Sequence, residues 1–152
     1  MTLSMFIKKQ VKEEIKSETS MDDAEIGYQS EINHYELLKE FFKDKDLKMS
    51  TNTYSLFDYF SEKTLIELKT RKICKDYYKT TIIGINKITY AKKHHKTFNI
   101  YFVFKFSDGL YYIKYDMEIF DKFQSEYKAR QDRGKYENKK YCLIPVGNLI
   151  KI

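Results

Sequence analysis

The chain has 152 residues, enough for one domain with its own hydrophobic core, and its 42% hydrophobic and 16% aromatic residues exclude an intrinsically disordered protein. Residues 1–60 hold 8 Lys and 12 Asp or Glu, whereas residues 61–152 hold 20 Lys or Arg and 10 Asp or Glu. The length predicts a single domain over residues 1–152. The basic C-terminal part favours binding of phosphate groups, with a solvated lysine-rich surface as the alternative.

The two cysteines, Cys74 and Cys142, lie far apart, and neither belongs to a Cys-x-x-Cys pair. A cysteine metal site is therefore not expected, and we expect the protein to occupy a reducing compartment. The N-terminus lacks the basic, apolar and small-residue pattern of a secretory leader, and no apolar run reaches membrane length. These features predict an intracellular protein, cytoplasmic or nuclear, without membrane contact.

Helical patterns dominate the first third of the chain. Apolar residues at i, i+4 spacing predict a helix over residues 3–17, an accessory element within residues 1–20. Ser20, followed three residues later by an aspartate, is typical of the start of a second helix. We expect this helix to end near Lys43, with Gly27 as a point of division. Its expected core face consists of Ile32, Tyr35, Leu38, Phe41 and Phe42.

A β-hairpin is expected next. Residues 48–60 and 64–70 have β-type composition and are separated by the polar turn 61–63. They favour two or three strands with an irregular start near Lys48. A basic helix over residues 81–96 is expected to follow.

The last third of the chain predicts a second hairpin, a helix and a terminal strand pair. An aromatic strand over residues 98–106, a turn at residues 107–109 and a return strand over residues 110–115 form the hairpin. Apolar residues at helical spacing predict a helix over residues 117–131. Residues 141–152 are expected to close the sheet.

Charged residues interrupt the strand over residues 64–70. Alternation places Leu65, Glu67 and Lys69 on one side of this strand. If the hairpin register places Asp58 opposite Glu67, their Cβ atoms lie about 5 Å apart. Two carboxylates and an ammonium group would then converge, and a divalent metal ion needs such carboxylates. The alternative is a solvated salt bridge between Glu67 and Lys69 on an exposed sheet face.

An Asp followed across a hairpin by Glu-x-Lys resembles the PD-(D/E)xK nuclease superfamily. The matching residues are Phe57-Asp58 and Glu67-Leu68-Lys69, with Phe where the superfamily usually has Pro. The resemblance covers about residues 24–115 and implies an α/β fold. It implies a restriction-endonuclease-like α-β-β-β-α-β core, in which helices flank a mixed central sheet, with an extra N-terminal helix and C-terminal hairpin and helix additions.

The resemblance also implies a Mg²⁺ site, with Mn²⁺ as the alternative cofactor. Asp58, Glu67 and the carbonyl group of Leu68 would be the metal ligands. Lys69 would orient or deprotonate the attacking water and stabilise charge in the transition state.

The superfamily often adds a glutamate from the helix before the hairpin. Glu36 is the preferred candidate here. Glu40 and Glu31 remain open, because Glu36 and Glu40 share one helix face and phase alone does not separate them.

Basic and aromatic residues after the motif resemble the phosphate-contacting elements of the superfamily. Lys87 lies in line with Ile83 and Ala91 on the expected helix, so its side chain can extend along packed residues toward the site. Arg71 can bind a phosphate through two parallel hydrogen bonds. Solvated charges and core aromatics are the alternatives. The expected nucleic-acid-binding residues are Arg71, Lys72, Lys87, Tyr90, Lys92 and Lys93.

These patterns favour a Mg²⁺-dependent DNA nuclease, either an endonuclease or an exonuclease. The first alternative is a catalytically inactive nucleic-acid-binding module of the same fold, and the second is a structural or interaction protein. DNA is the expected partner, with RNA left open and a homodimer as one arrangement. The Lys-, Asn-, Ile- and Tyr-rich composition is typical of a viral or mobile element.

Overall fold

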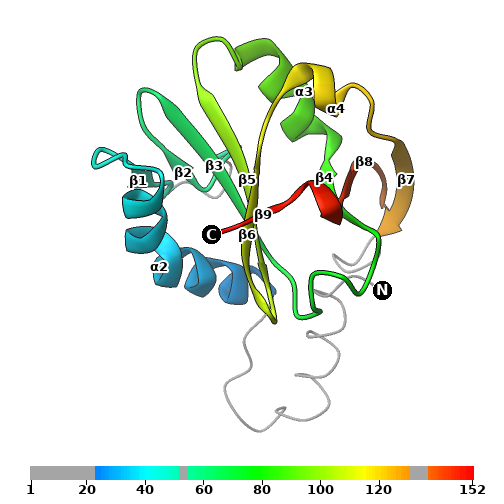
Figure 1. The fold of residues 1–152 in the computed structure, drawn as a ribbon, viewed down its shortest axis with the longest axis horizontal. Coiled ribbons are helices and arrows are strands. Elements are labelled where there is room, and N and C mark those ends of the chain that lie inside the picture. Colours follow the sequence, from blue (N-terminus) through cyan, green and yellow to red (C-terminus); the bar gives the residue numbers. More distant parts are fainter. Residues whose placement is uncertain (1–22, 52–54, 131–136) are drawn as a thin grey trace, which may run out of the picture.

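The computed structural model describes residues 23–51, 55–130 and 137–152 (Figure 1). The expected helix over residues 3–17 and the expected helix start at Ser20 lie outside these ranges. The described chain begins with helix α2 (Asp23–Phe41), which continues through Gly27 without a break. None of the helices in the described ranges is long and apolar enough to cross a membrane.

The larger sheet has six strands in the order β1-β2-β3-β5-β6-β9. It is a mixed sheet, because β3 runs parallel to β5 while the other neighbours are antiparallel. This arrangement gives the described chain a mixed α/β fold. The strands are β1 (Lys48–Met49), β2 (Tyr59–Phe60), β3 (Thr64–Thr70), β5 (Asn99–Phe106), β6 (Gly109–Lys114) and β9 (Ile150–Lys151).

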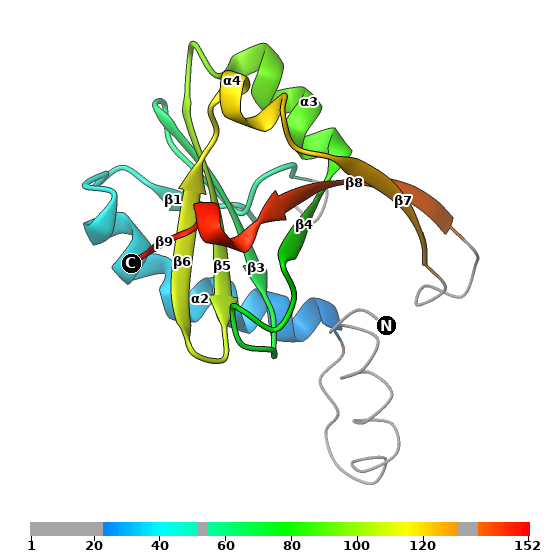
Figure 2. The ribbon, with the colours of Figure 1, turned by 45° about the vertical axis from the view of Figure 1, so that its right-hand side comes forward.

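Helices cover both faces of the larger sheet (Figures 1 and 2). On one face, Leu38 of α2 packs with Ile66 and Leu68 of β3. On the other face, Ala91 of helix α3 (Ile85–His94) packs in one cluster with Leu65 of β3. Because side chains alternate along a strand, β3 is buried on both faces.

Of the two or three strands predicted over residues 48–60 and 64–70, the second range is confirmed as β3. Within the described residues of the first range, only the two-residue strands β1 and β2 form. The predicted hairpin over residues 98–115 is also confirmed as β5 and β6. Its turn ends at Gly109, whose φ of +151° suits glycine. A Cβ atom there would lie 3.2 Å from the Tyr111 ring.

The predicted helix over residues 81–96 is wrong in its first part. Residues 80–84 form strand β4 (Thr80–Gly84), and the helix begins only at Ile85. The β-branched run before Gly84 favours a strand, and its buried residues Thr81 and Ile83 pair with Ile144 and Cys142.

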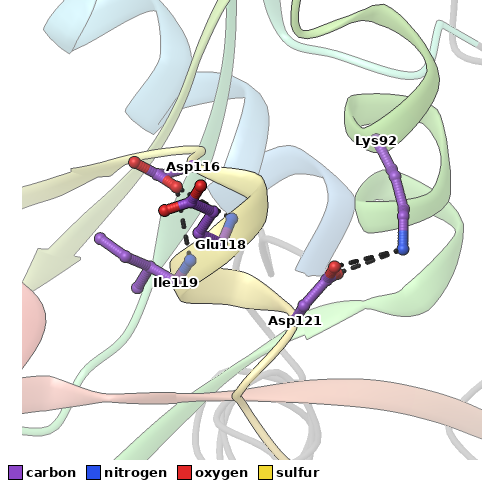
Figure 3. Close-up of polar contacts among 5 residues, drawn as sticks. All are labelled: Lys92, Asp116, Glu118, Ile119 and Asp121. Atoms are coloured by element: carbon purple, nitrogen blue, oxygen red, sulfur yellow. Dashed lines mark hydrogen bonds and ion pairs between the residues drawn. The ribbon is translucent and has the colours of Figure 1, made fainter.

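The predicted helix over residues 117–131 is also wrong beyond its first turn. Helix α4 (Met117–Phe120) is capped by Asp116, whose carboxylate accepts hydrogen bonds from the backbone N–H groups of Glu118 and Ile119 (Figure 3). The chain then enters strand β7 (Ser125–Arg130). Of the residues at helical spacing, Phe120 is buried but Tyr127 is exposed, so no single apolar face continues.

The predicted terminal strand pair is wrong as well, because its two strands lie in different sheets. Strand β8 (Glu137–Pro145) is the centre of a second sheet of order β4-β8-β7. A 3-10 turn, η1 (Val146–Asn148), leads from β8 to β9, which pairs with β6 at the edge of the larger sheet.

Candidate active site

A tight turn sets the register that brings the predicted motif together. The Ser61 N–H donates to the Thr64 carbonyl at 2.8 Å, and the Ser61 hydroxyl accepts from the Thr64 N–H at 3.0 Å. Tyr59 consequently pairs with Ile66 and Phe60 with Leu65. This is the predicted register, and it carries Asp58 to the position beside Glu67.

Asp58 immediately precedes strand β2, where the pairing of β2 with β3 ends. Its N–H donates to the Ile66 carbonyl at 3.0 Å, and its carboxylate oxygen Oδ2 accepts from the Leu68 N–H at 2.7 Å. Burial raises the pKa of Asp58, a hydrogen bond with Glu67 and the Leu68 N–H oppose the rise, and the charge of Glu31 adds to it.

Glu67 is a carboxyl group buried within β3, with only 3% of its side chain exposed. The Lys87 ammonium lies 3.0 Å and the Lys69 ammonium 3.7 Å from its Oε2 atom. Burial raises the pKa of Glu67 to about 7; Asp58 also raises it, while Lys69 and Lys87 lower it. The alternative interpretation, a solvated salt bridge on an exposed sheet face, is therefore wrong for Glu67.

Lys87 is the predicted phosphate-contacting residue that reaches this cluster. It extends from the first turn of α3, and its side chain is 15% exposed. Its ammonium also lies 5.5 Å from the centre of the Phe57 ring. Lys87 thus extends toward Glu67, although Ile83, one of the two residues in line with it in the expected helix, lies in strand β4.

Glu31, rather than Glu36, is the glutamate that α2 brings to the cluster. The Tyr59 hydroxyl donates to the Glu31 carbonyl at 2.6 Å, and the Thr70 hydroxyl donates to the Ser30 hydroxyl at 2.6 Å. These two hydrogen bonds fix this turn of α2 against the sheet. Burial raises the pKa of Glu31, a hydrogen bond with Asp58 lowers it, and the charge of Glu67 raises it again.

The preferred candidate Glu36 lies elsewhere on α2. It is exposed and lines a surface hollow together with Glu40, Asp44 and Lys63. Five positions along a helix turn a side chain through about 140°, so Glu36 and Glu31 project in different directions. The preferred candidate Glu36 therefore lies away from the cluster, and so does Glu40, which the sequence left open.

The other predicted nucleic-acid-binding residues have different surroundings. The Arg71 guanidinium donates to the Ile82 carbonyl at 3.0 Å and thereby joins the end of β3 to β4. Tyr90 stacks on His94 and packs against the core at Phe57. Lys92 forms an exposed ion pair with Asp121 at 3.3 Å (Figure 3). Lys72 and Lys93 are exposed.

The donor set at the site suits a hard divalent cation. Glu31, Asp58 and Glu67 supply carboxylate oxygens, which Mg²⁺ and Mn²⁺ prefer. The N–H and C=O groups of one strand residue point to the same strand edge, so the Leu68 carbonyl faces the Asp58 side as its N–H does. Within the described ranges, no three His, Cys, Asp or Glu residues lie close enough together to hold an ion as they stand.

Two lysines already supply positive charge at this cluster. The Lys87 ammonium contacts Glu67 Oε2 directly, and the Lys69 ammonium lies near the same oxygen. Positive charge thus already neutralises the Glu67 carboxylate. An ion that used Oε2 of Glu67 as a ligand would have to displace the Lys87 ammonium from that oxygen.

Comparison with known proteins gives one family. A family model described as "phage putative PDDEXK endonuclease" matches residues 10–152. No curated protein and no solved structure matches the chain.

Replacement of Lys87 with Met tests the buried ion pair. We expect Lys87→Met to lower the free energy of unfolding by roughly 3 kcal/mol at pH 8, because Glu67 is ionised there and loses its nearer cation. At pH 5.5 Glu67 is largely protonated, so the loss should be much smaller. Urea unfolding at both pH values measures this difference.

Lys92→Met is the matched control from the same helix. Its ion pair with Asp121 is exposed, so the variant should lose less than about 1 kcal/mol at either pH. An equal loss for Lys87→Met at pH 5.5 and pH 8 would contradict the role of the Glu67 charge.

Proposed function

Because the chain belongs to this phage family of PDDEXK endonucleases, we propose that it is a divalent-metal-dependent nuclease that hydrolyses phosphodiester bonds in DNA inside the host cell. The observation that carries the proposal is the cluster of Glu31, Asp58 and Glu67 with the ammonium groups of Lys69 and Lys87. Buried carboxylates with raised pKa values beside lysines are typical of catalytic sites.

The order of the elements supports a restriction-endonuclease-like core. Helix α2, the strands β1, β2 and β3, helix α3 and strand β5 follow the order α-β-β-β-α-β, and β5 lies parallel to β3. Strand β4, which precedes α3, belongs to the second sheet with β8 and β7 and would be an addition to that core.

Asp58, Glu67 and the Leu68 carbonyl would hold Mg²⁺ or Mn²⁺, with Glu31 as a further ligand. A bound ion of this kind lowers the pKa of water and stabilises charge on phosphate oxygens. The residues fit the ion because burial, and secondarily the charge of neighbouring carboxylates, raises the pKa of Glu31 and of Glu67, and a bound cation stabilises the charged form of both groups.

Lys69 would act on the reacting groups. Its side chain is 39% exposed and its ammonium lies 3.7 Å from Glu67, so it borders both solvent and the carboxylates. In this position it can hydrogen-bond an attacking water or a phosphate oxygen and stabilise charge that develops on the phosphate. Lys87, once displaced from Glu67, can donate to a phosphate oxygen in the same way.

DNA cleavage tests the proposed function. We expect the protein to cleave a labelled DNA duplex only with Mg²⁺ or Mn²⁺, and Asp58→Asn, Glu67→Gln and Lys69→Met each to reduce the rate at least about 100-fold. Lys45→Met, at an exposed lysine in the loop after α2, is the control and should cleave normally.

Duplex binding in EDTA, measured by fluorescence anisotropy, separates a nuclease from an inactive binding module. Asp58→Asn and Glu67→Gln should bind with near wild-type affinity, because neither removes positive charge, whereas Lys69→Met loses a partly exposed ammonium and should bind less tightly. Binding by the wild-type protein without metal-dependent cleavage would support the inactive module and overturn the proposal.

Metal affinity distinguishes Glu31 from Glu36. We expect Mn²⁺ to raise the melting temperature of the wild-type protein, and Glu31→Gln to weaken the apparent Mn²⁺ affinity about 10-fold or more. Glu36→Gln, from the same helix, should leave the affinity unchanged because Glu36 lines a separate hollow.

The same titration has a defined pH dependence. Burial raises the pKa of Glu67 to about 7, so this ligand must lose a proton before it binds an ion. The shift in melting temperature should therefore be larger at pH 8 than at pH 5.5. Equal shifts at both pH values, or equal affinities for Glu31→Gln and Glu36→Gln, would argue against these ligands.

A further inference from the structure

The outer part of strands β7 and β8 forms a two-stranded ribbon that extends from the rest of the protein (Figure 2). Strand β8 pairs with β4 only over residues 141–145. Residues 137–140 of β8 pair with residues 127–130 of β7 and have no β4 partner. Four strand residues span roughly 13 Å along the ribbon. The major groove of DNA, about 12 Å wide, admits a two-stranded ribbon of this kind.

Both faces of this ribbon carry lysine. Lys128 lies directly opposite Lys139, and Tyr127 lies directly opposite Lys140. Directly opposed residues share a face and neighbouring pairs alternate, so one face presents two lysines and the other presents a tyrosine and a lysine. Tyr127 is 66% exposed, and the Lys140 ammonium lies 5.8 Å from its ring centre.

Lys128 and Lys139 bring two positive charges close together on one face of the ribbon. Like charges directly across a strand pair destabilise the pairing. Glu126 lies 3.2 Å from Lys128, but this ion pair is about half exposed on both sides and offsets little. A polyanion that lies along the ribbon would neutralise both lysines and remove the repulsion.

The sequence that contains the ribbon strands has a net positive charge. Residues 122–141 contain seven Lys or Arg and three Asp or Glu. This excess of positive charge is complementary to the phosphate backbone of nucleic acid.

The ribbon leaves the protein close to the candidate active site. Tyr141, where β8 ends its pairing with β4, lies opposite Gly84. Gly84 immediately precedes α3, and Lys87 in the first turn of α3 contacts Glu67. A polymer bound at the carboxylate cluster can therefore continue onto the ribbon.

We propose that the β7–β8 ribbon binds duplex DNA beside the active site by placing its lysines against phosphates on the two sides of a groove. This inference rests on the proposed function for its choice of ligand. A two-stranded ribbon fits the major groove of duplex DNA, and lysines on both ribbon faces can reach both backbones. Single-stranded DNA offers one backbone and uses this arrangement less well.

Anisotropy titrations of labelled duplex DNA in EDTA at several salt concentrations test the ribbon. We expect Lys128→Gln/Lys139→Gln to weaken duplex binding at least about 5-fold and to reduce the slope of log affinity against log salt concentration by about 1 to 2. The matched control is Lys45→Gln/Lys48→Gln, which removes the same charge from exposed lysines near β1. The control should retain most of the affinity and slope.

Two further measurements identify the cause. The ribbon variant should have a melting temperature close to that of the wild-type protein, because both lysines are exposed on the surface. At saturating duplex it should keep the wild-type Mg²⁺-dependent rate and show only a higher KM.

Several results would overturn the ribbon proposal. One is an affinity and salt slope equal to those of the control variant, and another is an equal loss of affinity for single-stranded and duplex DNA. A fall in duplex affinity that accompanies a lower melting temperature would assign the effect to folding and would also overturn it. Failure of the wild-type protein to cleave DNA would refute the proposed function without changing these binding results.

Discussion

The burial of one charged side chain, Glu67, is the constraint on which the rest of the site depends. A carboxylate taken out of water is costly unless it is paired and hydrogen-bonded. Glu67 lies in a strand covered on both faces, and two lysines and an aspartate surround it. The remaining features of the site, from the turn at Ser61 to the start of α3, place those partners.

The short length of strand β2, which begins only at Tyr59, is the second feature that shapes the site. A longer β2 would cover the edge of β3 at Leu68 with main-chain hydrogen bonds, whereas here the Asp58 carboxylate accepts the Leu68 N–H. The edge therefore keeps a carboxylate and leaves a carbonyl facing the same space. Ile66 and Leu68 pack against α2, so this edge of β3 is held by a hydrophobic core.

The sequence predicted those parts of the fold that depend on local patterns. The polar turn over residues 61–63 and the alternation of side chains suggested one register that brings Asp58 beside Glu67, and the structure has this register. An aromatic run followed by Asp-Gly predicted the β5–β6 hairpin. Lys87 was expected to extend toward the site because it is in line with Ile83 and Ala91 on one helix. Ile83 lies in strand β4 instead, so the agreement for Lys87 was a coincidence of helical spacing.

The rest of the fold depends on long-range pairing that a single sequence does not specify. Strands β4 and β7 were mistaken for helix because their apolar residues also match a 3.6-residue period, and their pairing with β8 decided the outcome. Glu31 was distinguishable from Glu36 only through the contacts of α2 with Tyr59 and Thr70, which are distant in sequence. Helix phase alone does not contain that information.

Anomalous diffraction from crystals soaked with Mn²⁺ would locate an ion at the carboxylate cluster. We expect a single strong anomalous peak bounded by the carboxylates of Asp58 and Glu67 and the Leu68 carbonyl, with the Lys87 ammonium moved away from Glu67. A structure in which saturating Mn²⁺ leaves the ion pair between Lys87 and Glu67 intact, with no peak beside Asp58, would contradict this expectation.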